Sequence, residues 1–339
     1  FAVTAVGAGM LKGERRHTQF YWEDLYVTSF YPSWNETLET LWRGQLIEAL
    51  DGPHGGPPFR LPQNCEISEK PPHIILIHQE SVVQPSLFPG LKYDPAVDPF
   101  FRSFDGKLHP MRVETYGGAS WLTEFSILAG VSTHSFGGMR QFVQSLMAGK
   151  IRDTMPETLA RCGFRNVVFY PMLRNFVSNA RFYNAIGMPE VFDMKDQGAK
   201  TTLERDRFYF KNALDEMERH VGTSQKPLFT YVQTMSAHSP YNYIYEPDIQ
   251  VAGGGPGTDP QMHEYLRRLS LARIDYEWLR SEIKRRFPNE RILIVHYGDH
   301  HPIATRTFLG YDQYADPEDM TVHPEGPGFI TYYAVDGHN

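Results

Sequence analysis

Four short apolar runs restrict the fold of this chain more than any other feature of its sequence. Each is predominantly apolar and short, which is typical of a strand buried on both faces of a parallel sheet. Segments with helical periodicity lie between several of the runs. This alternation favours an α/β fold, with a mostly parallel central sheet and helices on both faces. The runs are residues 73–79 (HIILIHQ), 166–170 (NVVFY), 228–235 (LFTYVQTM) and 292–295 (ILIV).

The other elements are predicted from periodicity and capping signals. Residues 154–162 have Thr154 as N-cap and are followed by Gly163, a helix stop. The arginine-rich face near Arg267, within a long predicted helix, is expected to be solvated. The remaining predictions are helices at 36–50, 205–221 and 261–287, a short strand at 109–114 and a last strand at 328–335.

The main domain is predicted to begin at about Pro72, which divides the chain into an arm at 1–71 and a folded domain at 72–339. Residues 51–72 hold six prolines and three glycines, a composition unsuited to an element interior. Residues 1–11 are apolar and begin without Met, which fits either the exit from a membrane anchor or an N-terminal arm. No stretch has the ~18 to 20 apolar residues that span a bilayer.

Composition excludes some partners. The formal net charge of −7 argues against nucleic-acid binding, because no basic field would attract phosphate polymers. Aromatic residues make up 14% of the chain, which suggests broad apolar clefts or a membrane-proximal surface. The two cysteines, Cys65 and Cys162, are too few for a disulfide framework and do not form a metal-ligand pair, although a single bridge remains open.

Polar side chains follow several of the predicted strands. Ligands of open α/β sheets lie outside the carboxyl ends of the strands, so we expect these side chains to meet at one edge. Asp and His together suit Zn, Mn or Mg, and Glu80, Asp299 and His300 supply three ligands. The residues at strand ends are Glu80, Tyr170, His238, Asp299 and His300.

Ser120 is the predicted nucleophile. It follows two glycines and opens a predicted helix, whose N-terminal N–H groups favour an anion. A hydroxyl at the fourth position of a bound metal loses its proton readily. His238 could hydrogen-bond a substrate oxygen or protonate a leaving group.

For three further residues, the sequence allows two interpretations of the role of the side chain. His301 fits a second metal or a substrate pocket, or fills a turn. His296 lies within a strand, where a core histidine is favoured over a ligand. Trp121 fits the wall of a lipid or sugar site, or helix packing.

Four motifs give the chain a family resemblance. HQES around Glu80, GASWLTEF around Ser120, MSAHSPY around His238 and HYGDHH around Asp299 stand in the order of the sulfatase and alkaline-phosphatase superfamily. They most resemble its lipoteichoic acid synthase and phosphoglycerol transferase branch. That branch usually has Thr as nucleophile, so Ser120 is a conservative departure, and Thr123 is the alternative. Neither cysteine fits the C/S-x-P-x-R motif of formylglycine sulfatases.

The resemblance implies a metal-dependent phosphotransferase. It implies one divalent ion (Mn, Mg or Zn) held by Glu80, Ser120, Asp299 and His300, and a covalent phospho-intermediate on Ser120. It further implies that a phosphoglycerol-type group moves from a phospholipid to a glycan acceptor. The expected location is the extracytoplasmic (periplasmic) domain of an inner-membrane protein, at the membrane surface through an anchor.

The resemblance is incomplete where the branch holds the glycerol phosphate with a His, a Trp and an Arg. The matching positions here are Tyr170, Val177 and Asn179. Phosphoethanolamine transfer, phosphodiester hydrolysis and a non-catalytic binding protein therefore remain alternatives. The expected substrate-binding residues are Tyr170, Arg174, Arg181, His301 and Trp121.

Overall fold

The computed structural model describes Leu38, Trp42, Cys65 and residues 69–251, 259–310 and 326–338. The helix expected at 36–50 lies outside the described residues except for Leu38 and Trp42, which are helical. Most of the arm predicted at 1–71 lies outside them as well. None of the described helices is long and apolar enough to cross a membrane.

A seven-stranded sheet forms the centre of the domain, in the order β2-β7-β6-β1-β5-β3-β4. The five strands from β6 to β4 are parallel, whereas β7 runs antiparallel to β6 and β2 antiparallel to β7. The predicted mostly parallel sheet is therefore confirmed, with two antiparallel strands at one edge. The strands are β1 (His73–Gln79), β2 (His109–Arg112), β3 (Arg165–Phe169), β4 (Glu190–Phe192), β5 (Leu228–Gln233), β6 (Ile292–Gly298) and β7 (Ile330–His338).

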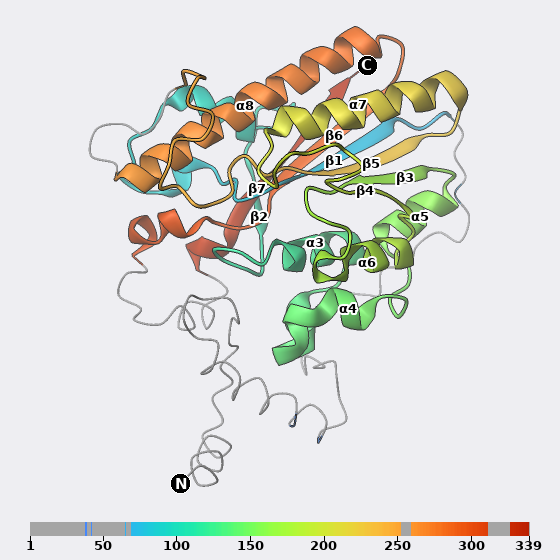
Figure 1. Ribbon diagram of the computed structural model, residues 1–339, viewed down its shortest axis with the longest axis horizontal. Coiled ribbons are helices and arrows are strands. Elements are labelled where there is room, and N and C mark those ends of the chain that lie inside the picture. Colours follow the sequence, from blue (N-terminus) through green and yellow to red (C-terminus); the bar gives the residue numbers. More distant parts are fainter. Residues whose placement is uncertain are drawn as a thin grey trace.

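Helices cover both faces of the sheet (Figure 1). On one face lie α7 (Asp206–Thr223) and α8 (Pro260–Arg286), and on the other lie α3 (Ser120–Ala129), α4 (Val143–Met147), α5 (Met155–Arg161) and α6 (Asn179–Ala185). Short 3-10 segments complete the described elements: η1 (Pro85–Leu87), η2 (Pro95–Phe101), η3 (Thr133–Phe142), η4 (Phe176–Ser178), η5 (Ile303–Thr305), η6 (Thr307–Leu309) and η8 (Pro327–Phe329).

The two faces of the sheet belong to separate apolar clusters. Along β1, Ile75 and Ile77 join the cluster formed with α7 and α8, while Leu76 joins the cluster formed with α3 to α6. Successive side chains of a strand point to opposite faces, so His78 faces the same side as Leu76 and α3. Burial on both faces explains why the sequence shows unbroken apolar runs here.

The arginine-rich stretch of α8 corrects one expectation. Arg267 is 7% exposed and Arg268 is fully buried, so this face of the helix is not solvated. Both guanidinium groups donate to backbone carbonyls of the segment that follows β5. The charge pattern of the sequence does not show that these arginines bond to backbone carbonyls. The sequence therefore suggested a solvated surface.

Cys65 and Cys162 form a disulfide, with their Cα atoms 5.1 Å apart. Cys162 is the C-cap of α5 and lies just before β3 begins. The sequence allowed a single disulfide without predicting it, and the structure contains that disulfide. It links the segment that precedes β1 to the amino end of β3.

Candidate active site

The turns after β1 and β6 approach each other unusually closely. A Cβ placed on Gly298 would lie 1.8 Å from the carbonyl oxygen of Val82, a distance that no side chain could tolerate. Ser81 has a φ of 57°, and its backbone N–H donates to Asp299 Oδ1 over 2.7 Å. The absence of a side chain at position 298 thus lets the two strand ends meet and brings Glu80 beside Asp299.

Ser120 lies at the first position of α3. The residues before it turn through left-handed conformations, with φ values of 74° at Gly117 and 60° at Ala119. The backbone N–H of Gly117 donates to the His301 carbonyl, 2.8 Å away, which fixes this turn against the segment after β6. The Ser120 hydroxyl consequently sits at a helix N-terminus, where the peptide dipoles favour negative charge.

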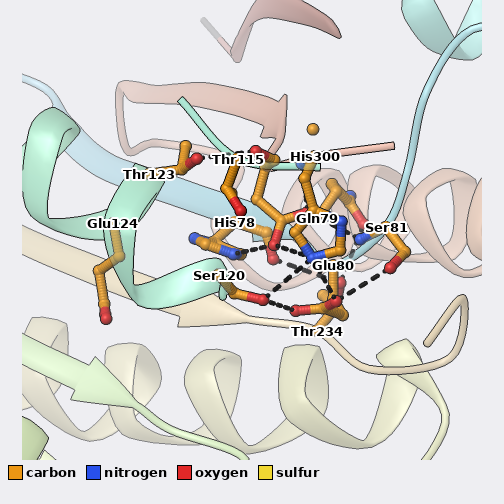
Figure 2. A network of polar contacts seen from close by, with 12 residues as sticks. His78, Gln79, Glu80, Ser81, Thr115, Ser120, Thr123, Glu124, Thr234 and His300 are labelled. Carbon is orange, nitrogen blue, oxygen red and sulfur yellow. Dashed lines mark hydrogen bonds and ion pairs between the residues drawn. The ribbon is translucent and has the colours of Figure 1, made fainter. Parts of the chain in front are cut away.

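Figure 2 shows Ser120, Glu80 and His300 in one polar cluster, to which Asp299 also belongs. Ser120 Oγ donates to Glu80 Oε2 over 2.6 Å and lies 3.2 Å from His300 Nε2. His300 Nε2 is also 3.1 Å from Glu80 Oε1 and 3.3 Å from Asp299 Oδ2. The structure therefore brings together all four residues that the sequence singled out as metal ligands.

The charges within the cluster shift the pKa values of Glu80 and His300 in opposite directions. Burial alone would raise the pKa of Glu80, but the charge and hydrogen bond of His300 outweigh it and hold the pKa well below its usual range. Burial alone would lower the pKa of His300, yet the charges of Asp299 and Glu80 raise it to about 9. The two carboxylates thus create a position that favours positive charge.

His78 adjoins the cluster and was missed by the sequence reasoning. Its Nε2 lies 3.0 Å from Asp299 Oδ2, and its Nδ1 lies 2.9 Å from the Tyr231 hydroxyl and 3.0 Å from the Tyr297 hydroxyl. A carboxylate only accepts, so Nε2 donates to Asp299 and orients it. Strand alternation was a signal that could have identified His78, because it points to the same face as Glu80, two positions later.

Glu124 stands apart from the bonded cluster, with no contact drawn to it (Figure 2). Burial raises its pKa, and hydrogen bonds from Gln144 and Tyr183 satisfy its carboxylate. Asn179, one of the positions matched to the glycerol-phosphate site, is buried and also donates to Glu124, at 3.4 Å. Asn179 is therefore engaged within the core of the domain.

His238 follows β5, as expected. It is partly buried, and its charge contributes, less than that of His300, to lowering the pKa of Glu80. Its Nδ1 lies 2.5 Å from the carbonyl oxygen of Ser239, which can only accept. Nδ1 therefore carries a proton, and this bond to the backbone holds the ring.

Three of the expected contact residues are held within the protein. His301 is fully buried, and its Nε2 lies 2.6 Å from the Ile330 carbonyl. Burial lowers the pKa of His301 to about 4. Tyr170 is also buried, and Trp121 Nε1 donates to the Gln141 carbonyl over 3.1 Å.

The two arginines are exposed, in different settings. Arg174 is bonded to Asp193 at 3.2 Å and to Asp196 at 2.5 Å, so a phosphate would have to displace these carboxylates. Arg181 borders a shallow hollow of about 410 Å³ that it shares with Ala148 and Gly149. None of the four clustered residues lines that hollow.

The alternative nucleophile, Thr123, is 3% exposed, and its hydroxyl donates to the Asp299 carbonyl over 2.8 Å. This hydroxyl is committed within the core, one turn into α3. Ser120 is therefore the hydroxyl that the fold presents beside the carboxylates.

The donor set fits a divalent cation. Glu80, Asp299 and His78 offer ligand atoms that all lie within 4.8 Å of one another. Of the two imidazoles, His300 is the better ligand, because its Nδ1 is bonded to the His301 carbonyl at 3.0 Å and its Nε2 faces Ser120. A neutral imidazole whose Nδ1 donates to a carbonyl presents a bare Nε2, as metal-binding histidines do.

Comparison with known proteins places the chain in a family. The sulfatase family model matches residues 74–324, most of the chain and all of the residues of the cluster. The chain belongs to the sulfatase family. This confirms the predicted superfamily and the prediction of an enzyme of the sulfatase-like type.

Two curated relatives match this sulfatase-family chain over part of their length. A protein of Haemophilus influenzae described as uncharacterized is 23% identical over 69% of this chain and 44% of its own. A protein of Rhizobium meliloti described as a "putative cyclic beta-1,2-glucan modification protein" is 24% identical over 68% of this chain and 36% of its own. The chain thus spans less than half the length of these relatives.

Solved structures share the fold. The Streptococcus pyogenes phosphoglycerol transferase GacH, in complex with sn-glycerol-1-phosphate, has a TM-score of 0.58 and 18% identity, covering 78% of this chain and 68% of that one. The lipoteichoic acid synthase LtaP from Listeria monocytogenes has a TM-score of 0.58 and 17% identity, covering 78% and 65%. At these identities the likeness concerns the fold.

Proposed function

We propose that this sulfatase-family protein transfers a phosphoglycerol-type group from a phospholipid to a glycan acceptor, through a covalent phospho-serine on Ser120. One observation carries the proposal. The Ser120 hydroxyl stands at a helix N-terminus, 2.6 Å from Glu80 and 3.2 Å from His300. A nucleophile, an acidic ligand set and a dipole that stabilises an anion therefore coincide.

We propose Glu80, Ser120, Asp299 and His300 as the residues that hold one Mn, Mg or Zn ion, with His78 orienting Asp299. When bound, such an ion lowers the pKa of a serine hydroxyl and neutralises charge on a phosphoryl group. The site carries two buried carboxylates with the imidazole of His300 between them. A cation in place of the proton on His300 would satisfy the same charges.

The transfer takes two displacements. In the first, Ser120 reacts as the alkoxide, and its Oγ forms a bond to the donor phosphorus while the bond from phosphorus to the diacylglycerol oxygen breaks. His238, as the imidazolium, delivers its Nε2 proton to that leaving oxygen and becomes neutral. In the second, a hydroxyl of the glycan loses its proton to His238 Nε2, bonds to phosphorus and releases Ser120 as the alkoxide, which restores the enzyme.

Relatives support the choice of substrates. GacH was solved with a glycerol phosphate, and the Rhizobium relative carries a glycan-modification description. An extracytoplasmic location is supported by the disulfide between Cys65 and Cys162, because such bonds persist in oxidising compartments. We accordingly propose that residues 72–339 are the catalytic domain of a membrane-anchored periplasmic protein.

The test is intact mass spectrometry after incubation with Mn²⁺ and phosphatidylglycerol. We expect a phosphoglycerol adduct on Ser120, released when a glycan acceptor is added. Ser120→Ala should abolish the adduct and lower turnover by at least ~100-fold, because the nucleophile is lost. Thr123→Ala is the matched control and should retain the adduct.

Other outcomes of this test identify the alternatives. An adduct formed only with phosphatidylethanolamine would indicate phosphoethanolamine transfer, and release by water alone would indicate a phosphodiesterase. Unchanged turnover in Ser120→Ala would contradict the nucleophile. A metal content unchanged in Asp299→Asn, measured by elemental analysis, would contradict the ligand set.

A further inference from the structure

Arg268 of α8 is the largest fully buried side chain of the described residues, and it contacts the segment that carries His238. Its Nη1 donates to the His238 carbonyl over 2.5 Å, and its Nη2 donates to the Pro240 carbonyl over 2.8 Å. We propose that Arg268 is a positioning residue that fixes His238 for proton transfer. The inference rests on the proposed function and adds a residue that the sequence motifs do not contain.

Three tyrosines of the same segment enclose the guanidinium group. Its central carbon lies 5.2 Å from the ring centre of Tyr241, 4.9 Å from that of Tyr243 and 5.1 Å from that of Tyr245. A cation at this distance from a ring is attracted by the π electrons. The segment from His238 to Tyr245 therefore wraps around a single arginine.

Glu264, one turn earlier on α8, completes the enclosure. Its Oε1 accepts from Arg268 Nε over 2.9 Å and from the backbone N–H of Tyr245 over 2.8 Å. The carboxylate balances the buried charge and also holds the far end of the segment. Both ends of the loop are thus bonded to one ion pair on one helix.

This arrangement resists movement of His238. Any displacement of the loop would leave a buried guanidinium without its acceptors, which is strongly unfavourable. With the His238 backbone fixed by Arg268 and Nδ1 bonded to Ser239, the ring has one orientation left for Nε2. Lysine could replace the charge of Arg268 but not its fork of donors to two carbonyls.

The experiment compares two substrates whose leaving groups differ. Dihexanoyl phosphatidylglycerol releases an alcohol that needs a proton, whereas bis-p-nitrophenyl phosphate releases a phenolate that does not. We expect Arg268→Lys to lower kcat/KM for the phosphatidylglycerol at least ~10-fold and to leave the nitrophenyl ester nearly unchanged. A general loss of structure would lower both rates together.

A double-mutant cycle separates positioning from folding. In a His238→Ala background, Arg268→Lys should cause no further loss, because the group it positions is absent. Arg267→Lys is the matched control: this neighbour donates to the Tyr245 and Glu246 carbonyls farther along the loop and should keep wild-type selectivity between the substrates. If Arg268→Lys does not fold, Tyr243→Leu, at a residue that is 44% exposed, weakens the same enclosure and should show a smaller loss with the same substrate selectivity.

Two results would overturn the inference. Equal losses on both substrates, in both backgrounds, would assign Arg268 to the general stability of the domain. A His238→Ala variant with wild-type turnover of phosphatidylglycerol would remove the proton-transfer role of His238 and the positioning role with it. The phospho-serine proposal fails separately, through the Ser120 adduct.

Discussion

At the scale of single residues, the site depends on which nitrogen of each imidazole carries the proton. His300 directs Nε2 toward Ser120, whereas His78 uses Nε2 to hold Asp299. His301, next in the chain, faces a backbone carbonyl in the core. Consecutive histidines thus have unrelated roles, because the turn after β6 points each ring in a different direction.

His296 leads to a prediction about acid sensitivity. Burial among aromatic rings lowers its pKa to about 3, and Phe100 stacks on it at 5.0 Å. The unfolded chain binds a proton at this histidine below about pH 6.5, whereas the folded protein does not, so stability falls as pH decreases through this window. Wild type should lose about 2 kcal/mol more unfolding free energy than His296→Phe between pH 7 and pH 5.

Urea unfolding at the two pH values measures this difference. His263→Gln, which changes an exposed histidine of α8, should behave as wild type. Equal losses in wild type and His296→Phe would show that His296 does not remain neutral in the fold.

At the scale of elements, the sequence predicted the parallel strands well, because burial on both faces leaves unbroken apolar runs. It could not show that β7 reverses direction, since strand direction depends on the path of the preceding chain. It also missed β4, whose three residues are too few to form a pattern. The charge pattern wrongly predicted a solvated face at Arg267 and Arg268, because the carbonyls that accept from these arginines lie in the distant segment after β5.

The same reasoning explains which site residues could be predicted. Glu80, Asp299 and His300 come shortly after apolar runs, and Ser120 follows two glycines, so local sequence reveals all four. The contribution of His78 depends on pairing, since it lies opposite Tyr297 of β6 and Gln233 of β5. Strand alternation predicts which face His78 points to, but neighbouring residues do not show which residues of β5 and β6 it pairs with.

The contact between the ends of β1 and β6 gives a prediction for Gly298. Gly298→Ala would place a methyl group against the Val82 carbonyl, so the two turns must separate. We expect an unfolding free energy lower by about 1–3 kcal/mol, together with weaker Mn²⁺ binding measured by calorimetry, because Glu80 moves away from Asp299. Gly337→Ala in β7 is the control, since an added Cβ there has nothing within 4 Å. Equal effects of the two substitutions would contradict this account.

At the scale of the whole molecule, the disulfide joins residues separated by 97 positions. Linking distant residues restricts the unfolded chain, so we expect the Cys65→Ser, Cys162→Ser double variant to be less stable by about 2–5 kcal/mol. Dithiothreitol should lower the melting temperature of wild type to about that of the double variant and leave the melting temperature of the double variant unchanged. An unaltered melting temperature of reduced wild type would contradict the prediction. The folded double variant should keep its turnover, because Cys162 precedes β3 at the amino end of the strand, whereas the polar cluster lies beyond the carboxyl ends.

The polar cluster draws its members from segments that begin at Glu80 and end at His300. No fragment of the chain shorter than this span can contain the complete set, and β1, α3 and β6 must all be docked before the set exists. Occupancy by a cation would therefore report on tertiary assembly as well as on catalysis. When refolding is monitored through the signal of a paramagnetic ion, binding of that ion should mark the moment at which the last of these elements docks.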